Sequence, residues 1–167
     1  AEGAERGRMI MPCGTGKSLT AFWIAQALDV KTILVAVPSL ALIKQSLADW
    51  TREFLAHGQI PEWLCVCSDE TVGEVHTDDI LSHAYDLGID TTTDAETIAK
   101  FLSKKTDSPK IVFATYQSGM KLGEGALLAE CEIDLAILDE AHKTVGKKDK
   151  LFASLLSDEN VPIKRRL

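Results

Sequence analysis

The chain has 167 residues, of which 46% are apolar, and its 25 acidic and 18 basic side chains give a net charge of −7. This length and apolar content suit a single domain with one core. The acidic balance excludes a protein that holds nucleic acid through bulk positive charge, so any nucleic-acid site must be small and local. No apolar run is long enough to span a bilayer, and the first residues, AEGAERGR, lack the apolar core of a signal peptide. We therefore expect a cytoplasmic protein with no membrane partner.

A strand and a helix flank a glycine-rich turn near the start of the chain. Residues 8–11, RMIM, predict a short apolar strand that runs directly into the turn. The stretch after the turn has apolar side chains at helical spacing, namely Leu19, Phe22, Trp23 and Ala27. Strand, loop and helix in this order form the context that a phosphate-binding loop requires.

The next elements continue the alternation of strands and helices. The β-branched run over 32–38, which Pro38 ends, suits a strand buried on both faces of a parallel sheet. Ser39 then caps an amphipathic helix, and its apolar stripe consists of Leu40, Ile43, Leu47, Trp50 and Phe54. A further strand is predicted over 62–68.

The second half of the chain begins with a less regular stretch. Residues 69–93 predict only a short helix around 78–86. A capping box of Thr93 and Glu96 opens a helix over 95–105, which cannot continue past Pro109. The remaining predicted elements are a strand over 110–116, a short helix over 122–130, an apolar strand beginning at 133 and a helical fragment over 150–157.

Apolar strands that alternate with helices predict an α/β domain with a parallel sheet and right-handed crossovers. In such sheets ligands bind at the carboxyl ends of the strands. The polar motifs of this chain each follow a strand, at 12–18, 38–39, 115–118 and 139–142. We therefore expect them to meet at one edge of the sheet.

The four cysteines of the chain are scattered, at Cys13, Cys65, Cys67 and Cys131. The close pair has C-x-C spacing, which is tighter than the C-x2-C of common zinc sites. We interpret Cys65 and Cys67 as small apolar residues of a buried strand with reduced thiols. A metal cluster that adds His57 or His76 to this pair is the less favoured alternative.

The stretch MPCGTGKS, residues 11–18, is the first candidate site. It departs from the pattern G-x-x-x-x-G-K-[ST] because Met11 stands at the first glycine position. Gly14 and Gly16 allow backbone N–H groups to face a polyphosphate at the start of a helix. Lys17 would then be a point charge for the outer phosphates, and Ser18 would offer one oxygen to Mg2+. The alternative interpretation is an ordinary glycine turn that caps a helix.

The stretch DEAH, residues 139–142, is the second candidate site. A metal–nucleotide site needs a carboxylate opposite the phosphate loop, and Asp139 supplies one directly after an apolar strand. The neighbouring Glu140 can accept the proton of an attacking water. A pair of solvated acids beside a stray histidine is the alternative, and the upstream phosphate loop disfavours it.

MPCGTGKS and DEAH together resemble motifs I and II of the DEAD/DEAH-box-like superfamily 2 helicases and translocases, in which motif I often lacks the first glycine. VAVPSLALIKQ, residues 35–45, is similar to motif Ia of these proteins. VFATYQS, residues 112–118, is similar to motif Ib in the branch that contains restriction-enzyme helicase subunits. The resemblance implies that residues 1–167 form a RecA-like P-loop NTPase domain, the first of two motor domains, with a subgroup-specific segment over 69–105.

The resemblance also implies ATP and Mg2+ as cofactors and assigns a role to each motif residue. The nucleotide would be bound by Pro12, Cys13, Gly14, Thr15, Gly16, Lys17 and Ser18. The metal ion would be held by Ser18 and Asp139, and catalysis would use Glu140, Asp139 and Lys17. His142 would couple the nucleotide site to the nucleic-acid site. Backbone contacts to one DNA strand would come from Pro38, Ser39, Thr115, Tyr116 and Gln117.

In this family an arginine finger and further motifs lie on a second RecA-like domain. The present chain ends at VPIKRRL, where the motif III strand is expected to begin, so we expect a domain truncated before motif III. ATP hydrolysis would then need the full-length protein, and DNA binding by this domain would be weak. A kinase-like P-loop phosphotransferase, a non-catalytic nucleotide-binding module and an RNA helicase domain remain the alternative functions.

Overall fold

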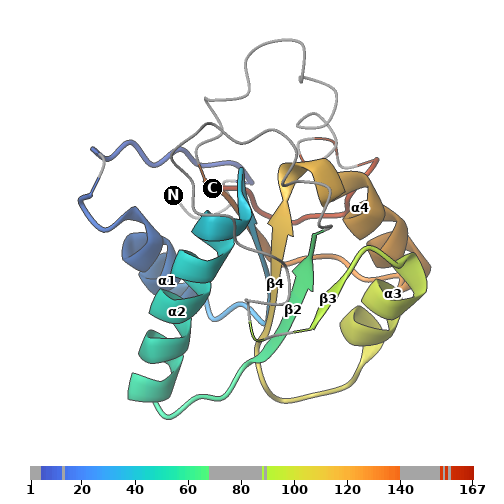
Figure 1. Cartoon of the computed structure of the whole chain (residues 1–167), viewed down its shortest axis with the longest axis horizontal. Coiled ribbons are helices and arrows are strands. Elements are labelled where there is room, and N and C mark those ends of the chain that lie inside the picture. Colours follow the sequence, from blue (N-terminus) through green and yellow to red (C-terminus); the bar gives the residue numbers. More distant parts are fainter. Residues whose placement is uncertain are drawn as a thin grey trace.

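The computed structural model describes residues 5–12, 14–67, 88, 90–139, 155, 157 and 159–167. Within this part of the chain, a five-stranded sheet has the order β3-β2-β4-β1-β5 (Figure 1). All four strand pairs are parallel, which confirms the predicted α/β fold with a parallel sheet. The strands are β1 (Thr32–Val37), β2 (Glu62–Val66), β3 (Thr91–Thr92), β4 (Lys110–Thr115) and β5 (Leu135–Leu138).

Helices cover both faces of this sheet. Helices α1 (Lys17–Ala27) and α2 (Leu40–Ala56) pack on one face, and α3 (Ala95–Ser103) and α4 (Gly119–Leu128) pack on the other (Figure 1). A short 3-10 helix, η3 (Tyr116–Ser118), joins β4 to α4. Among the described residues no helix is both long enough and apolar enough to cross a bilayer.

The central strands are apolar at every position because both of their faces are buried. In β1, Ile33 and Val35 point into the core beneath α1 and α2, whereas Leu34 and Ala36 point into the core beneath α3 and α4. Successive side chains of a strand alternate between faces, so a strand between two helix layers must be apolar on both. This burial explains the continuous apolar run in the sequence.

Helix α2 confirms the predicted stripe and its cap. All five stripe residues are buried: Leu40, Ile43, Leu47, Trp50 and Phe54. The Ser39 hydroxyl accepts a hydrogen bond from the backbone N–H of Leu42 at 3.4 Å, which satisfies one of the unpaired donors of the first turn.

One prediction at the amino end is wrong and another is confirmed. Residues 8–11 form no strand, and Ile10 is 84% exposed; an isolated bridge, between Arg6 and Arg166, lies just before them. The helix predicted from apolar spacing is confirmed as α1; it buries Ala21, Phe22 and Ala25, whereas Leu19 and Trp23 are 36% and 48% exposed. Because this helix is apolar on most sides, its sequence does not indicate which of its apolar residues face the core.

The cap of α3 also differs from the prediction. The N-cap is Asp94, one residue after the predicted Thr93, and its carboxylate accepts from the backbone N–H of Thr97 at 2.8 Å. A carboxylate suits this position better than a hydroxyl because it also complements the positive end of the helix dipole. The hydrogen bonds from Thr97 lower the pKa of Asp94.

The bounds of other elements differ slightly from the predictions. Strand β2 ends at Val66, and α4 begins at Gly119 and ends at Leu128. The predicted helix at 78–86 and most of the predicted fragment at 150–157 lie outside the described residues. Within the predicted irregular segment 69–105, the described part contains β3 and α3.

Residues 163–167 extend the sheet beyond β5. The backbone N–H of Ala136 donates to the Arg165 carbonyl at 2.8 Å, and that of Leu138 donates to the Leu167 carbonyl at 2.9 Å. On the other side, the N–H of Gly7 donates to the Arg166 carbonyl at 2.8 Å. The C-terminal segment therefore lies between β5 and the N-terminal segment that leads into the glycine-rich turn.

Candidate functional site

The glycine-rich turn adopts a backbone that only glycine tolerates well. Gly14 and Gly16 have φ angles of +76° and +87°, both in the left-handed region. Gly16 is the N-cap of α1, so Lys17 and Ser18 form the first turn of that helix. The Thr15 hydroxyl donates to the Pro12 carbonyl at 2.7 Å and closes the turn. Cys13 lies outside the described residues.

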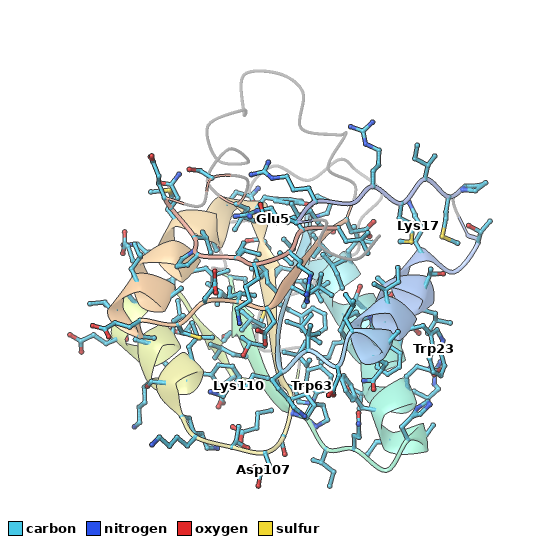
Figure 2. The ribbon with its side chains drawn as sticks, turned by 180° about the vertical axis from the view of Figure 1, so that it is seen from behind. Glu5, Lys17, Trp23, Trp63, Asp107 and Lys110 are labelled. Carbon is cyan, nitrogen blue, oxygen red and sulfur yellow. The ribbon has the colours of Figure 1, made fainter. Side chains whose placement is uncertain are left out.

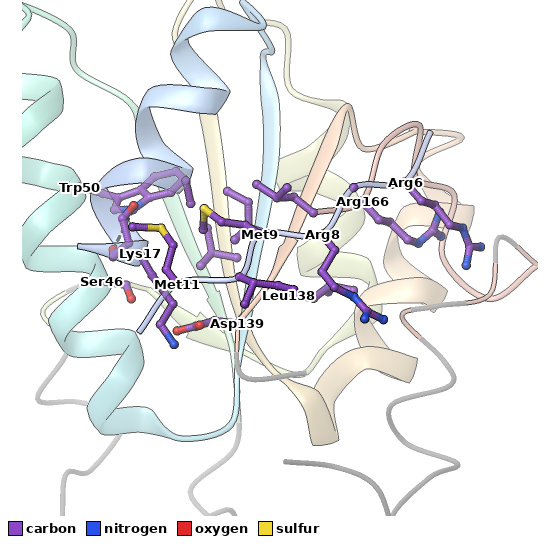
Figure 3. A pocket seen from close by; sticks show the side chains of 17 residues that line it. Arg6, Arg8, Met9, Met11, Lys17, Ser46, Trp50, Leu138, Asp139 and Arg166 are labelled. Atoms are coloured by element: carbon purple, nitrogen blue, oxygen red, sulfur yellow. Dashed lines mark hydrogen bonds between the residues drawn. The ribbon is translucent and has the colours of Figure 1, made fainter. Parts of the chain in front are cut away.

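A pocket of about 980 Å³ lies beside this turn. Its wall includes Lys17 and Ser18 from α1, Trp50 from α2 and Asp139 from the end of β5. Figure 3 shows the side chains of Lys17 and Asp139 pointing toward one another in this pocket. Asp139 directly follows β5, so the pocket is at the carboxyl end of the sheet; Figure 2 labels Lys17 at this site and Lys110 at the start of β4.

The groups gathered in the pocket fit a metal–phosphate ligand. Ser18 offers a hydroxyl oxygen and Asp139 a carboxylate, and both side chains are half-buried. Oxygen donors of this kind are the ligands that Mg2+ prefers, and the nearby Lys17 ammonium suits the phosphate oxygens. The structure thus brings together three of the residues that the motifs singled out, from opposite ends of the chain.

The indole of Trp50 contacts Ser18 directly. Its Nε1–H lies 3.2 Å from the Ser18 hydroxyl and 3.2 Å from the Ser18 carbonyl oxygen, and it donates to both. The sequence predicted Trp50 only as a core residue of α2, and it carried no signal for this hydrogen bond. Trp50 therefore connects the second helix to the proposed metal ligand.

Asp139 is held through its backbone by two neighbouring elements. Its N–H donates to the Ala36 carbonyl of β1 at 2.9 Å, and its carbonyl accepts a hydrogen bond from the Tyr116 hydroxyl of η3. Sequence reasoning also missed this tyrosine contact, because no local pattern relates residues so far apart. Glu140 and His142 lie outside the described residues, so their catalytic and coupling roles stay predictions.

The five candidate nucleic-acid residues lie at the carboxyl ends of the neighbouring strands β1 and β4. The register pairs Val37 with Thr115, so Pro38 and Ser39 lie at the same edge as Thr115, Tyr116 and Gln117. Thr115 is buried, and its hydroxyl hydrogen-bonds that of Ser118 at 3.1 Å. Tyr116 is 3% exposed and Ser39 is half-buried, whereas Gln117 is exposed. Contact with nucleic acid stays a prediction, and these exposures favour Gln117 and Ser39 over the buried pair.

Two neighbouring arginines of the C-terminal segment, Arg165 and Arg166, differ in their surroundings. Arg166 is 6% exposed, and its guanidinium donates to the carbonyls of Leu155, Val161 and Ile163 at 3.0 to 3.3 Å. Arg165 is exposed. The guanidinium of Arg166 therefore holds the C-terminal segment through three backbone carbonyls.

The cysteine pair lies in the core, as predicted. Cys65 and Cys67 are buried, with 3.4 Å between their sulfur atoms. Their mutual hydrogen bond and their burial raise the pKa of Cys65. Among the described residues no group of three His, Cys, Asp or Glu side chains could hold a metal ion.

Comparison with known proteins gives a matching family model and similar solved structures, among them two Type ISP restriction-modification enzymes. The family model for the Type III restriction enzyme, res subunit, matches residues 1–161. The Type ISP restriction-modification enzyme LlaGI, solved as a nuclease-deletion mutant with a DNA substrate mimic, is 28% identical with a TM-score of 0.74. The ATP-dependent Type ISP enzyme LlaBIII, solved bound to DNA, is 31% identical with a TM-score of 0.80. No curated protein matches at a significant level.

These matches cover nearly all of the present chain and a small part of the other two. They span 98% of this chain in both comparisons, but 15% of the LlaGI chain and 11% of the LlaBIII chain. The likeness therefore concerns one domain of larger enzymes. With the parallel sheet and the loop at its carboxyl edge, it identifies the fold as that of the RecA-like, ATP-binding motor domain of superfamily 2 helicases and translocases. The chain belongs to the family of the Type III restriction enzyme res subunit.

Proposed function

We propose that this domain binds Mg-ATP in the pocket beside Lys17, and that the whole protein uses ATP hydrolysis to move along DNA. The observation that carries the proposal is that Lys17, Ser18 and Asp139 line one pocket at the carboxyl end of the sheet. A cation, a hydroxyl and a carboxylate in this arrangement are what a metal-bound polyphosphate requires. The family match and the similarity to the ATP-dependent enzyme LlaBIII support this reaction class.

Each side chain then has a defined task. The N–H groups of the turn and the positive end of α1 face the phosphates, and Lys17 positions the outer ones. Ser18 and Asp139 hold Mg2+, which neutralises part of the phosphate charge when it is bound. Glu140 accepts the proton of the attacking water. His142 couples the nucleotide site to the nucleic-acid site.

DNA is the proposed track because LlaGI and LlaBIII were both solved with DNA. The contacts would be made to the sugar-phosphate backbone by Gln117, Ser39 and their neighbours at the ends of β1 and β4. The net charge of −7 predicts that this domain alone binds weakly and loses the DNA at moderate salt. A second RecA-like domain downstream would complete both the DNA path and the ATP site.

A kinase-like phosphotransferase would need a lid and an acceptor pocket in addition to the phosphate loop. The match of the restriction-enzyme family to residues 1–161 favours the motor domain instead. An RNA helicase shares the same loop chemistry, and the experiment on DNA stimulation described below separates the two.

Calorimetric titration with Mg-ADP tests the nucleotide site. We expect micromolar to millimolar binding by the chain and none by Lys17→Ala, because the variant loses the phosphate-facing charge. Lys44→Ala, which removes an exposed lysine on the outside of α2, is the matched control and should bind like the wild type. Equal binding by wild type and Lys17→Ala would refute the site.

Phosphate release tests the motor function. The assay compares the present chain, the full-length protein and full-length Glu140→Gln, each with single-stranded DNA, with RNA and without nucleic acid. We expect turnover and DNA stimulation in the full-length protein alone, because an arginine finger contributes about 10³ to 10⁵ in rate. Stimulation by RNA but not by DNA would overturn the choice of track, and full activity of Glu140→Gln would overturn the assigned base.

A further inference from the structure

The indole of Trp50 is placed to control how Ser18 presents its hydroxyl oxygen to a metal ion. Trp50 is 1% exposed and packs edge-on against Phe22 and Phe113, with ring centroids 5.5 and 6.3 Å away. Its ring therefore has a fixed orientation in the core beneath α1 and α2. The Nε1–H at its rim reaches both the hydroxyl and the carbonyl oxygen of Ser18, at 3.2 Å each.

The hydrogen bond from the Trp50 indole determines which parts of the Ser18 hydroxyl remain available to the pocket. An indole N–H donates and cannot accept, whereas a serine hydroxyl has one proton and two lone pairs. The indole occupies one lone pair of the Ser18 oxygen, which leaves the other lone pair and the proton for the pocket. Mg2+ demands near-ideal octahedral geometry with short bonds, so an oxygen whose orientation is fixed in advance is a better ligand than a freely rotating one.

We propose that Trp50 is a positioning residue that orients the Ser18 hydroxyl for Mg2+ in the nucleotide site. This inference rests on the proposed function of the pocket and adds a residue of α2 to its metal-binding machinery. Groups that orient a metal ligand typically contribute 10- to 100-fold to metal affinity. Because the indole N–H is hydrogen-bonded to Ser18, the residue proposed to bind Mg2+, loss of this N–H should reduce the gain in nucleotide affinity that Mg2+ gives and leave the affinity for nucleotide without Mg2+ unchanged.

Trp50→Phe removes the N–H donor and keeps an aromatic ring in the core. Trp63→Phe is the matched control, because Trp63 packs in the same core, stacked on Phe113 with centroids 5.9 Å apart, and makes no contact with Ser18 among the described interactions. ADP is titrated into each variant in EDTA and at increasing Mg2+. Mg2+ should increase the affinity for ADP, and we expect Trp50→Phe to raise the Mg2+ concentration that gives half of this increase about tenfold. Its affinity in EDTA should equal that of the wild type, and Trp63→Phe should change neither quantity.

A double-mutant cycle separates orientation from general loosening of the core. In Ser18→Ala, Mg2+ should no longer increase the affinity for ADP. Adding Trp50→Phe to this variant should not change the dependence of ADP affinity on Mg2+ any further. An equal loss of affinity in EDTA and in Mg2+ for Trp50→Phe, or a shift no larger than that of Trp63→Phe, would overturn the inference. If the wild type binds ADP with no dependence on Mg2+, the proposed metal site itself fails, and the inference fails with it.

A measurement on the wild type keeps the test valid if Trp50→Phe does not fold. The chain has three tryptophans, so its indole N–H groups give three proton signals that Trp23→Phe and Trp63→Phe assign by elimination. The Trp50 signal should shift when Mg2+ is added to the ADP complex and should differ in Ser18→Ala. A Trp50 signal that responds to neither change would contradict the proposed role.

Discussion

Arg166 holds the C-terminal segment against the sheet, and replacing it should be costly. Its guanidinium donates to the carbonyls of Leu155, Val161 and Ile163 from a position that is 6% exposed. Arg166→Met keeps much of the side-chain volume and removes every one of these donors. Three buried carbonyl groups then lose a partner, and they cannot turn to bulk water without local unfolding.

The size of the effect follows from those three hydrogen bonds. A hydrogen bond to a charged group contributes about 1.5 kcal/mol or more, and part of the loss is recovered because the charge no longer has to be desolvated. We therefore expect Arg166→Met to lower the free energy of unfolding by about 3 to 5 kcal/mol. That is a large share of the total stability of a domain, which is about 5 to 15 kcal/mol.

Urea denaturation of the chain measures this loss, and Arg165→Met is the control. Arg165 is the exposed neighbour on the same segment, so its replacement should change the stability by less than about 0.5 kcal/mol. The free energy of unfolding of such a domain falls by about 2 kcal/mol for each molar of urea, so Arg166→Met should lower the urea concentration at the unfolding midpoint by about 2 M. A midpoint no lower than that of Arg165→Met would refute the reasoning.

Three further substitutions test other contacts. Asp134→Asn should destabilise the chain at neutral pH. Burial raises the pKa of Asp134, but the Lys164 ammonium and two backbone N–H groups outweigh it and lower the pKa overall. The stabilisation by Asp134 is thus complete above the usual aspartate pKa and is lost as the pH falls through the lowered pKa of Asp134. If the wild type remained more stable than Asp134→Asn below that lowered pKa, this reasoning would be wrong. Gly125→Ala places a Cβ 2.4 Å from Ile98 and should cost about 1 to 3 kcal/mol, so an unchanged melting temperature would count against the packing of α3 on α4. Tyr116→Phe frees the Asp139 carbonyl and should lower ATP turnover by the full-length protein several-fold with little change in ADP affinity; unaltered turnover would exclude a role for this hydrogen bond.

The sequence was most informative where one residue pattern has one structural solution. The apolar run of β1 is compatible with a doubly covered strand and little else, and the stripe of α2 repeats at helical spacing over four turns. Left-handed backbone favours glycine, so the pattern of Gly14 and Gly16 was enough to predict the turn of the loop.

Elsewhere several solutions were equally compatible with the local pattern. Helix α1 is apolar on most sides, so the burial of Ala21 over Trp23 depends on how close the helix lies to the sheet. The same holds for the site: the approach of Trp50 to Ser18 depends on the distance between two helices. Sequence spacing gives the residues that share a face of one helix, but it does not give the distance to the next helix.

The place of residues 163–167 in the sheet has a consequence for the order of folding. The backbone of Glu5 and Gly7 pairs with Arg166, and the glycine-rich turn begins only a few residues after Gly7. The two partners are separated by almost the whole chain, and contacts of such long separation form slowly because a large loop must close first. We therefore expect β1, β4 and α2 to assemble early and the approach to the phosphate loop to be completed last. During synthesis the N-terminal segment would stay unpaired until Arg166 has left the ribosome. Because residues of this segment line the nucleotide pocket, we expect nucleotide binding only after Arg166 has been synthesised and has paired with it.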